Sequence, residues 1–466
     1  MSEKRQKFPG FLFLGGLLIF SLLLAACASP GSASGQSSAL PGGSGTRGTN
    51  RTQTGSGAPS SATQQQPVST SCPATGTARA AVIQPMTLGS HKNIVYIVNQ
   101  GGTTHPTLGT LKRYDVTAGN KTEILNLSKT YISDAVLSAD GQWILFVAIA
   151  SNQPKLQLVR MDGTMLQTLY CAQVAPNGAA ATSALSNVEW STNQKLIIFN
   201  SYNSAGNQVL LLNAQTGNLQ TELTVSNGGP YPVATWLDST RVYLLGQSID
   251  APADSLYLLD TSKGSNQSVH SLTRVFQNVP VNGNYACWGF DSSYDGSRLY
   301  ASECTEKPNS TRPGVGAIAG PSQLVAQPAT GGRSGTIYSN ASVAITSVRA
   351  VTSNTLLLLF ENQSFSSTSV DTSQNGLWKI NSDGTGLKRL TSDGGGVGAG
   401  PSILCQYSQY PWSNVSRDSG MYALQHNSSD GKTVSLLFGS LNGGSTTTFA
   451  SISDGTQLSI IGWTTM

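Results

Sequence analysis

Apolar and polar residues alternate in short runs along most of the chain beyond residue 75, and clusters of Gly, Asn, Asp and Ser separate these runs. A period of two residues is typical of half-buried β-strands, whereas an amphipathic helix repeats every three to four residues. No segment of this region has a convincing helical period. The pattern therefore predicts an all-β fold.

One unit recurs along this region: a strand, a tight turn and a strongly apolar strand. It is clear in "DAVLSADGQWILFVA" (Asp134–Ala148) and "NVEWSTNQKLIIFN" (Asn187–Asn200). Weaker copies are "ATWLDSTRVYLLG", "CWGFDSSYDGSRLYAS", "SVRAVTSNTLLLLF" and "PWSNVSRDSGMYAL". A second hairpin follows most copies, as in "LWKINSDGTGLKRLT" (Leu377–Thr391). Two linked hairpins per repeat predict the four-stranded antiparallel blades of a β-propeller.

The two ends of this region complement each other. "HKNIVYIVNQ" (His91–Gln100) has the pattern of a second strand, and "LSIIGWTTM" (Leu458–Met466) has that of an innermost strand. If the C-terminal strand joins the N-terminal blade, it completes one more blade and leaves no open sheet edge. We therefore predict seven blades, with six and eight as alternatives.

The clearest copies also resemble a known repeat. "LSADGQWILFVA" and "LWKINSDGTGLKRLT" are similar to the two halves of the TolB-like, WD-type propeller repeat, S-P-D-G-x-x-I-x-F and D-x-D-G-x-x-x-x-L-T. Ala139 stands where the family has Pro, and "STNQ" lacks the turn Gly. The resemblance implies a propeller over residues 76–466 and carries no catalytic motif.

The N-terminus predicts a location outside the cytoplasm. A basic segment at residues 4–7 precedes the apolar run "FLFLGGLLIFSLLL", which is followed by "LAAC" ending at Cys27. This arrangement resembles the lipobox of bacterial lipoproteins, which implies a signal peptide over residues 1–26 and a lipid on Cys27. An uncleaved anchor with an incidental Cys27 is the alternative. In both cases we expect a bacterial cell-envelope protein on the extracytoplasmic side of a membrane.

Residues 27–75 join this anchor to the predicted propeller. Ser, Gly, Thr and Gln dominate the segment, which has almost no apolar material to offset the entropy lost on ordering. We therefore predict a disordered tether. Charged residues make up 11% of the whole chain, its net charge is +4, and no basic run exists outside the N-terminus. This distribution argues against nucleic acid as a partner.

The cysteines fit an oxidising compartment. Around the turn at Asp295-Gly296, facing residue numbers of a regular hairpin add up to 591, as do those of Cys287 and Cys304. We therefore predict a disulfide between these two residues across their hairpin. One more pair could form among Cys72, Cys171 and Cys405, and the chain has no C-x-x-C motif that would indicate a metal site.

Loop lengths predict where a partner binds. The turns within hairpins are short, whereas the other connections are long, as in Asn99–Gly109, Cys171–Ala184, Glu303–Ser322 and Thr391–Pro411. In a propeller these longer connections share one face, and loops on a rigid scaffold often carry binding residues. We expect this face to bind a protein or glycan partner, with the membrane contacted through the N-terminal lipid. The candidate residues for this face are Trp236, Trp288, Tyr410, Trp412, Asp134 and Glu189.

Catalysis has weaker support in the sequence. The four His are scattered, no metal-ligand or nucleophile motif occurs, and no cofactor is expected. Asp134 and Glu189 are the acidic residues of the predicted inner strands, and an acid pair in the channel could serve a glycoside hydrolase or lyase. The sequence favours non-enzymatic binding, with a carbohydrate-active enzyme as one alternative and a structural surface protein without a discrete ligand as another.

Overall fold

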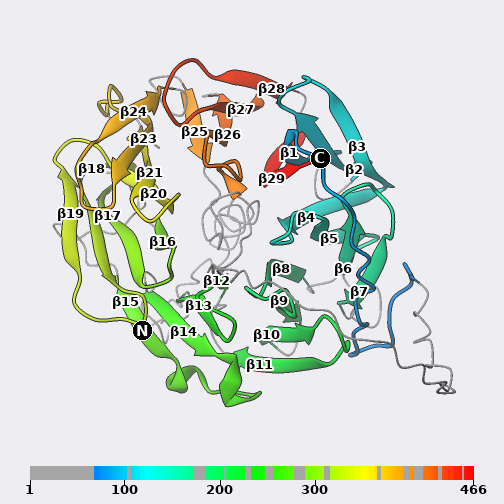
Figure 1. Ribbon diagram of the computed structural model, residues 1–466. Helices are drawn as coiled ribbons and strands as arrows, with labels where there is room; N and C mark the ends of the chain where they lie inside the picture. Colours follow the sequence, from blue (N-terminus) through cyan, green and yellow to red (C-terminus); the bar gives the residue numbers. More distant parts are fainter. Residues whose placement is uncertain are drawn as a thin grey trace, which may run out of the picture.

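Seven antiparallel sheets form a ring around a central axis (Figure 1), and each has four strands arranged from the axis outward, with one short strand added to one of them. The computed structural model describes residues 68–101, 106–172, 184–203, 206–225, 232–246, 255–277, 289–308, 315–364, 369–392, 399–403, 413–428, 433–453 and 456–466. The chain is a seven-bladed β-propeller. The predicted fold class and the favoured number of blades are confirmed.

The first three blades follow the chain in order, except that blade I takes its innermost strand from the C-terminus. From the axis outward, blade I holds β29 (Gln457–Thr465), β1 (Lys92–Gln100), β2 (Leu108–Asp115) and β3 (Lys121–Ser128). Blade II holds β4 (Thr130–Leu137), β5 (Trp143–Ala150), β6 (Gln153–Arg160) and β7 (Gln167–Cys171). Blade III holds β8 (Ala184–Trp190), β9 (Leu196–Asn203), β10 (Gly206–Asn213) and β11 (Leu219–Val225).

The remaining blades repeat this order. Blade IV holds β12 (Val233–Trp236), β13 (Arg241–Gly246), β14 (Ser255–Asp260) and β15 (Thr273–Gln277), with the 3₁₀ helices η1 (Thr261–Lys263) and η2 (Val269–Ser271) before β15. Blade V holds β16 (Phe290–Ser292), β17 (Arg298–Pro308), β18 (Val315–Pro328) and β19 (Gly335–Asn340). Blade VI holds β20 (Ile345–Ala350), β21 (Thr355–Phe360), β23 (Gly376–Asn381) and β24 (Lys388–Thr391). Blade VII holds β25 (Ala399–Ile403), β26 (Met421–Ser428), β27 (Val434–Ser440) and β28 (Thr447–Ile452).

The two ends of the propeller region close the ring. β29 pairs antiparallel with β1, from Lys92 opposite Thr465 to Asn99 opposite Gln457. This confirms the predicted closure by the C-terminal strand. Arg417 of blade VII reinforces the closure, because its Nη1 donates to the carbonyl of Ala139 in blade II at 2.7 Å.

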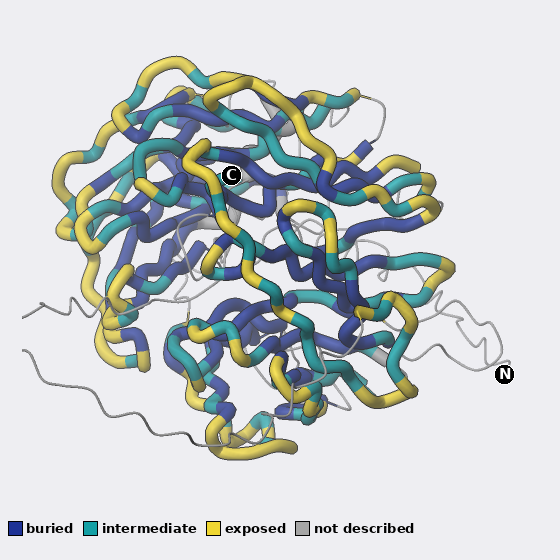
Figure 2. The backbone as a smooth tube through the Cα atoms, turned by 45° about the vertical axis from the view of Figure 1, so that its right-hand side comes forward, coloured by how far each residue is buried: buried dark blue, intermediate teal, exposed yellow. Residues whose placement is uncertain are grey.

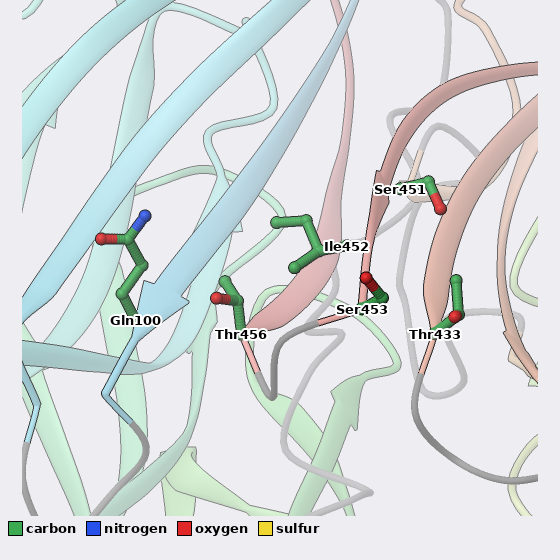
Figure 3. Close-up of a pocket in the computed structure, with 6 residues that line it drawn as sticks. All are labelled: Gln100, Thr433, Ser451, Ile452, Ser453 and Thr456. Atoms are coloured by element: carbon green, nitrogen blue, oxygen red, sulfur yellow. The ribbon is translucent and has the colours of Figure 1, made fainter.

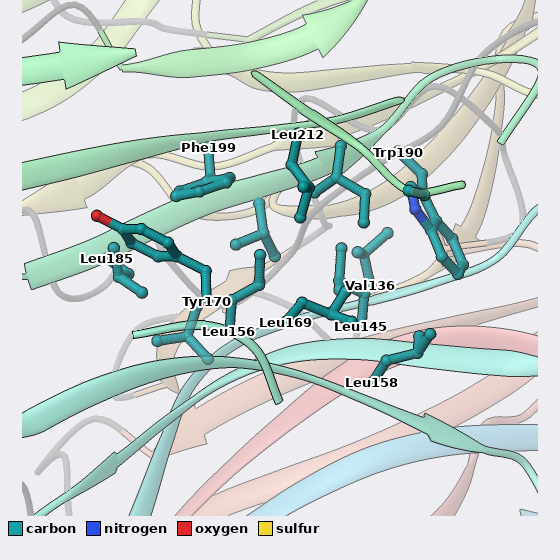
Figure 4. Packing of buried hydrophobic residues seen from close by; sticks show 14 of the residues in the cluster. Val136, Leu145, Leu156, Leu158, Leu169, Tyr170, Leu185, Trp190, Phe199 and Leu212 are labelled. Carbon is teal, nitrogen blue, oxygen red and sulfur yellow. The ribbon is translucent and has the colours of Figure 1, made fainter. Parts of the chain in front are cut away.

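The hydrophobic core lies between neighbouring blades. In one cluster, Val136 and Leu145 of blade II pack with Leu185, Trp190 and Phe199 of blade III (Figure 4). Burial is concentrated in the strands, while exposed residues gather at connections and edges (Figure 2). Because each blade covers the faces of its neighbours, the ring buries apolar side chains on both sides of each sheet.

A shared side-chain arrangement forms several inner turns. The Ser138 hydroxyl donates to Asp140 Oδ1 at 2.5 Å, and the backbone N–H of Trp143 donates to the Ser138 hydroxyl at 2.9 Å. The same pairs recur as Ser191 with Asn193, Ser293 with Asp295 and Ser416 with Asp418. These side chains satisfy backbone groups of the turn, which explains the repeated Ser-x-Asp/Asn pattern.

The Asp-Gly turns of the outer hairpins have a further role between blades. Gly384 of blade VI has a φ of +87°, and a Cβ there would collide with the carbonyl oxygen of Ile337 in blade V. Gly163 of blade II has a φ of +84° and lies in the same way against the carbonyl oxygen of Ile124 in blade I. Glycine is therefore required by backbone conformation and by close approach of the neighbouring blade.

Residues 68–90 form an extended segment on the propeller, which we call the N-terminal strap. Cys72 forms a disulfide with Cys171 of β7, with a Cα–Cα distance of 5.7 Å. The backbone N–H of Thr168 donates to the Ser69 carbonyl at 2.9 Å, and farther along the strap the N–H of Met86 donates to Gln142 Oε1 at 2.6 Å. The strap thus follows blade II, and its contacts begin before residue 75, where the sequence suggested that the tether ends.

Two segments differ from the expected loops. Much of Glu303–Ser322 is an extension of the hairpin of β17 and β18, whose pairing continues to Pro308 opposite Val315. β22 (Gln363–Ser364) adds to this extension by pairing with Ala317 and Ile318. The expected loop at 391–411 also contains β25, whose pairing with β26 forms part of the inner edge of blade VII. Backbone pairing satisfies polar groups in the described part of both segments, although their Gly, Pro and Ser content suggested loops.

Candidate functional site

The strand order separates the connections between two faces of the ring. The turns between first and second strands and between third and fourth strands share one face, which we call the turn face. The connections between second and third strands and between blades share the other, which we call the loop face. Inner turns such as 138–142 and 191–195 are short. Strand ends on the loop face are often farther apart in sequence, as between β7 and β8 and between β21 and β23, although residues 261–272 between β14 and β15 lie on the turn face.

Asp134 of β4 is enclosed between blades II and III. Asp134 is 1% exposed, and its Oδ2 accepts a hydrogen bond from the Val188 N–H of β8 at 3.0 Å. Burial raises the pKa of Asp134 to about 7. Asp134 therefore links adjacent inner strands, and its carboxylate is not presented to solvent.

Glu189 is also buried, and it interacts with a charged residue of another inner strand. Glu189 is 1% exposed, and its charge favours the charged form of Arg349 in β20 of blade VI. Asp291 of β16 lies 3.3 Å from Arg349, measured from Oδ1 to Nη1. Burial raises the pKa of Asp291 to about 6 and lowers that of Arg349, whereas their mutual attraction opposes both shifts.

Sequence reasoning did not single out Asp291, although it named Asp134 and Glu189. Asp291 Oδ2 accepts a hydrogen bond from the Ala350 N–H at 2.7 Å, which joins blades V and VI as Asp134 joins blades II and III. The shared signal is an acidic residue a few positions before the inner turn. In the described residues these carboxylates act between blades, and none of the three forms an open acid pair.

The aromatic candidates separate into two groups. Trp236 is 0% exposed and packs with Val233, Val242 and Leu244 in the core between blades III and IV. It is therefore a core residue. Trp288, Tyr410 and Trp412 lie outside the described residues, as does Cys27.

Only one of the two cysteines predicted to form a disulfide across the blade V hairpin lies within the described residues. Cys304 is 1% exposed and disulfide-bonded, whereas Cys287 lies outside the described residues. The hairpin has the expected register, because Phe290 faces Ala301 and Ser292 faces Leu299, pairs whose numbers add up to 591. The disulfide of Cys287 with Cys304 stays a prediction. The second pair, left open by the sequence, is Cys72 with Cys171.

A groove of about 530 Å³ opens on the loop face where blade VII meets blade I (Figure 3). Its lining residues come from the ends of β1 and β28, the start of β27 and the connection into β29. They are Gln100, Thr433, Ser451, Ile452, Ser453 and Thr456. Sequence reasoning missed this groove because scattered Ser and Thr residues carry no motif, and the two halves of its lining are far apart in the chain.

Metal binding and membrane insertion are two further possibilities for the described part of the chain. There, no group of three or more His, Cys, Asp and Glu side chains is arranged to hold a metal ion. No helix within the described residues has the length and apolar character needed to cross a membrane.

The comparisons with known proteins concern the fold. Neither models of known families nor curated protein sequences match this chain. Among solved structures, oligogalacturonate lyase from Vibrio parahaemolyticus is similar at 11% identity and a TM-score of 0.37, over 56% of this chain and 63% of that one. TolB from Acinetobacter baumannii is similar at 13% identity and a TM-score of 0.38, over 63% and 62% of the two chains. The matches thus span less than two thirds of the length of these two proteins.

A third similar structure is the periplasmic gluconolactonase PpgL from Pseudomonas aeruginosa. It shares 11% identity at a TM-score of 0.45, over 79% of this chain and 99% of that one. The activities in these names belong to the named proteins.

Proposed function

We propose that the chain is a lipid-anchored extracytoplasmic protein whose propeller binds a protein or glycan partner through the loop face. The observation that carries the proposal is the asymmetry of the two faces. The groove and most of the widely spaced strand ends lie on the loop face, whereas side-chain hydrogen bonds hold several tight turns on the turn face, where residues 261–272 are the main exception. A closed ring gives such connections a rigid base, which favours binding without a large loss of entropy.

The proposed location rests on the lipoprotein-like signal sequence at residues 1–27 and has independent support from the disulfides. The Cys72–Cys171 bond joins the strap to blade II, and Cys304 is also oxidised. Such bonds persist in oxidising compartments and are rare in the cytoplasm. They therefore support folding of the propeller outside the cytoplasm.

Binding without catalysis accounts best for the acidic residues of the inner strands. A carbohydrate-active enzyme would need a pair of carboxyl groups that a substrate can reach. Asp134 and Glu189 are each 1% exposed, and one carboxylate oxygen of Asp134 accepts a hydrogen bond from the backbone of the next blade. We therefore propose structural roles for both residues and place ligand binding on the loop face.

The anchor is tested by detergent-phase partitioning and mass measurement of the full chain. Wild-type protein should enter the detergent phase and carry a diacylglyceryl group, whereas Cys27→Ser should lose that group. Cys72→Ser is the matched control and should keep the lipid, because Cys72 is bonded within the folded part. Detection of an unmodified Cys27 in the mature wild-type protein would contradict lipid anchoring.

The binding face is tested by partner capture from envelope extracts. Gln100→Arg introduces a bulky charge at an exposed loop-face position, and Ser353→Arg does the same on the turn face. We expect Gln100→Arg to reduce recovery of the captured partner at least about fivefold, because a charge in an interface has to be desolvated. Equal recovery with Gln100→Arg and a loss with Ser353→Arg would place binding on the opposite face.

A further inference from the structure

The groove on the loop face spans the junction at which the ring closes. Gln100 ends β1 of blade I, whereas Ser451 and Ile452 end β28 of blade VII. Thr456 lies on the connection from blade VII into the C-terminal strand, and Thr433 precedes β27. A ligand in this groove would therefore contact both blades that meet at the closure.

The chemistry of the lining is polar and uncharged. Four of its six side chains carry hydroxyl groups and one carries an amide, and the described lining contains no charged residue. Hydroxyl and amide groups each combine donor with acceptor capacity, so they can match the hydroxyl groups of a ligand in either direction. Among the described lining residues a charged ligand would find no counter-charge, and desolvation of an uncompensated charge is costly.

Ile452 supplies the apolar part of the lining. In Figure 3 it lies between Gln100 on one side and Ser453 and Thr433 on the other. A sugar ring has C–H groups on its faces and hydroxyl groups at its rim, which corresponds to one apolar residue surrounded by hydroxyl and amide groups. An extended apolar ligand would leave the surrounding polar side chains unpaired.

The local structure holds part of this lining in place. The Ser451 and Ser435 hydroxyl groups lie 3.0 Å apart in a hydrogen bond across β28 and β27. Thr433 is held by a hydrogen bond of 2.8 Å from its N–H to the Ser428 hydroxyl. Thr456 is 6% exposed, so its position is set by packing. Preorganised donors and acceptors lose little entropy when a ligand binds.

We propose that this groove is a binding site for an uncharged oligosaccharide, which rests on the proposed function and assigns a glycan to the loop face. Its volume of about 530 Å³ lies in the range of about 300–1,000 Å³ common for ligand pockets. The bound saccharide would bridge blades I and VII and stabilise the closed ring through binding to the folded state.

Calorimetric titration of the full-length protein in detergent tests this assignment. The uncharged probes are chitotetraose, maltotetraose and cellotetraose, the acidic probe is tetragalacturonate, and the peptide probe is tetraalanine. We expect at least one uncharged probe to bind with a Kd below about 1 mM and the other two classes to bind at least tenfold more weakly. Binding restricted to the acidic or peptide probe, or absent for all uncharged probes, would overturn the oligosaccharide assignment.

Three substitutions locate the site. Ser453→Trp should abolish binding by filling the groove, and Thr433→Val should weaken it about fivefold by removing one hydroxyl group. Thr448→Val is the matched control, because Thr448 is an exposed residue of β28 outside the groove. Unchanged affinity in both Ser453→Trp and Thr433→Val would overturn the assignment to this groove. Partner contacts found elsewhere on the loop face would still support the proposed function, so the two proposals fail separately.

Discussion

The carboxylate of Asp134 in blade II accepts a hydrogen bond of 3.0 Å from the backbone N–H of Val188 in blade III. This contact joins the inner strands of two blades at a site that is almost fully buried, since Asp134 is 1% exposed. The contact needs an oxygen acceptor, but it does not need a negative charge. Asn can supply the acceptor without the cost of burying an ionised carboxylate.

Asp134→Asn should change how stability depends on pH. Burial raises the Asp134 pKa from 3.8 to about 7, so between these values the folded protein holds a proton that the unfolded chain releases. The free energy of unfolding should therefore fall as pH rises from about 4 to about 7 and stay level above that range. Asp134→Asn should remove this contribution and be more stable than wild type at pH 8, by about 1–4 kcal/mol.

The measurement is guanidinium unfolding of both proteins at pH 4, 6 and 8. Asp383→Asn, at an exposed turn, is the control and should keep the contribution of Asp134. Parallel pH profiles for Asp134→Asn and wild type would contradict the assigned role of Asp134.

Gly384→Ala tests the close approach of blades V and VI. An added methyl group would meet the carbonyl oxygen of Ile337 at a residue whose φ is +87°. We expect a loss of about 2–4 kcal/mol in the free energy of unfolding, from backbone strain together with displacement of the neighbouring strand. Gly119→Ala is the control, because its φ is +72° but the nearest atom to the added group is 3.9 Å away. Equal losses of unfolding free energy in the two variants would contradict the close contact between blades V and VI.

Arg417→Ala should weaken ring closure. Arg417 donates to the carbonyl oxygen of Ala139 at 2.7 Å and to that of Trp463 at 3.3 Å, so it connects blade VII with blades II and I. Loss of these charged hydrogen bonds should cost about 2 kcal/mol in the free energy of unfolding. Lys92→Ala removes only a half-exposed ion pair with Asp418 and should cost less than about 1 kcal/mol. The reverse order in a thermal or chemical unfolding series would exclude Arg417 as a closure residue.

The double substitution Cys72→Ser with Cys171→Ser should release the N-terminal strap. The disulfide links residues 99 positions apart, and a loop of this length predicts a stabilisation of about 4.7 kcal/mol in the entropy model. We expect a lower unfolding midpoint and faster proteolytic cleavage within residues 68–90, measured under non-reducing conditions. Cleavage at the wild-type rate would show that hydrogen bonds alone hold the strap.

The sequence predicted the parts of the fold that depend on local pattern. The Ser138–Asp140 turn and its equivalents carry turn chemistry in neighbouring residues, and the strands around them alternate regularly. The closure of β29 on β1 was predictable because each end of the propeller region lacked a partner strand. The register around Asp295-Gly296 was also predictable, since a short turn fixes which residues face each other.

Features that depend on distant residues were not predictable in the same way. The strap has no strand period, and its contacts use backbone groups and single side chains such as Gln142. The hairpin extension to Pro308 has a composition typical of loops, but pairing satisfies its backbone. The groove joins Gln100 to residues more than 300 positions later, and no local pattern links them.

The central claim is that the loop face contacts the partner, and site-specific photo-crosslinking in intact cells tests it most directly. A photoreactive phenylalanine analogue is placed at Gln100 or Ser453 on the loop face, and at Ala118 or Ser353 on the turn face, all exposed positions. The account predicts adducts of higher mass from Gln100 and Ser453 and none from Ala118 and Ser353. Adducts from the turn face alone, or from neither face, would contradict it.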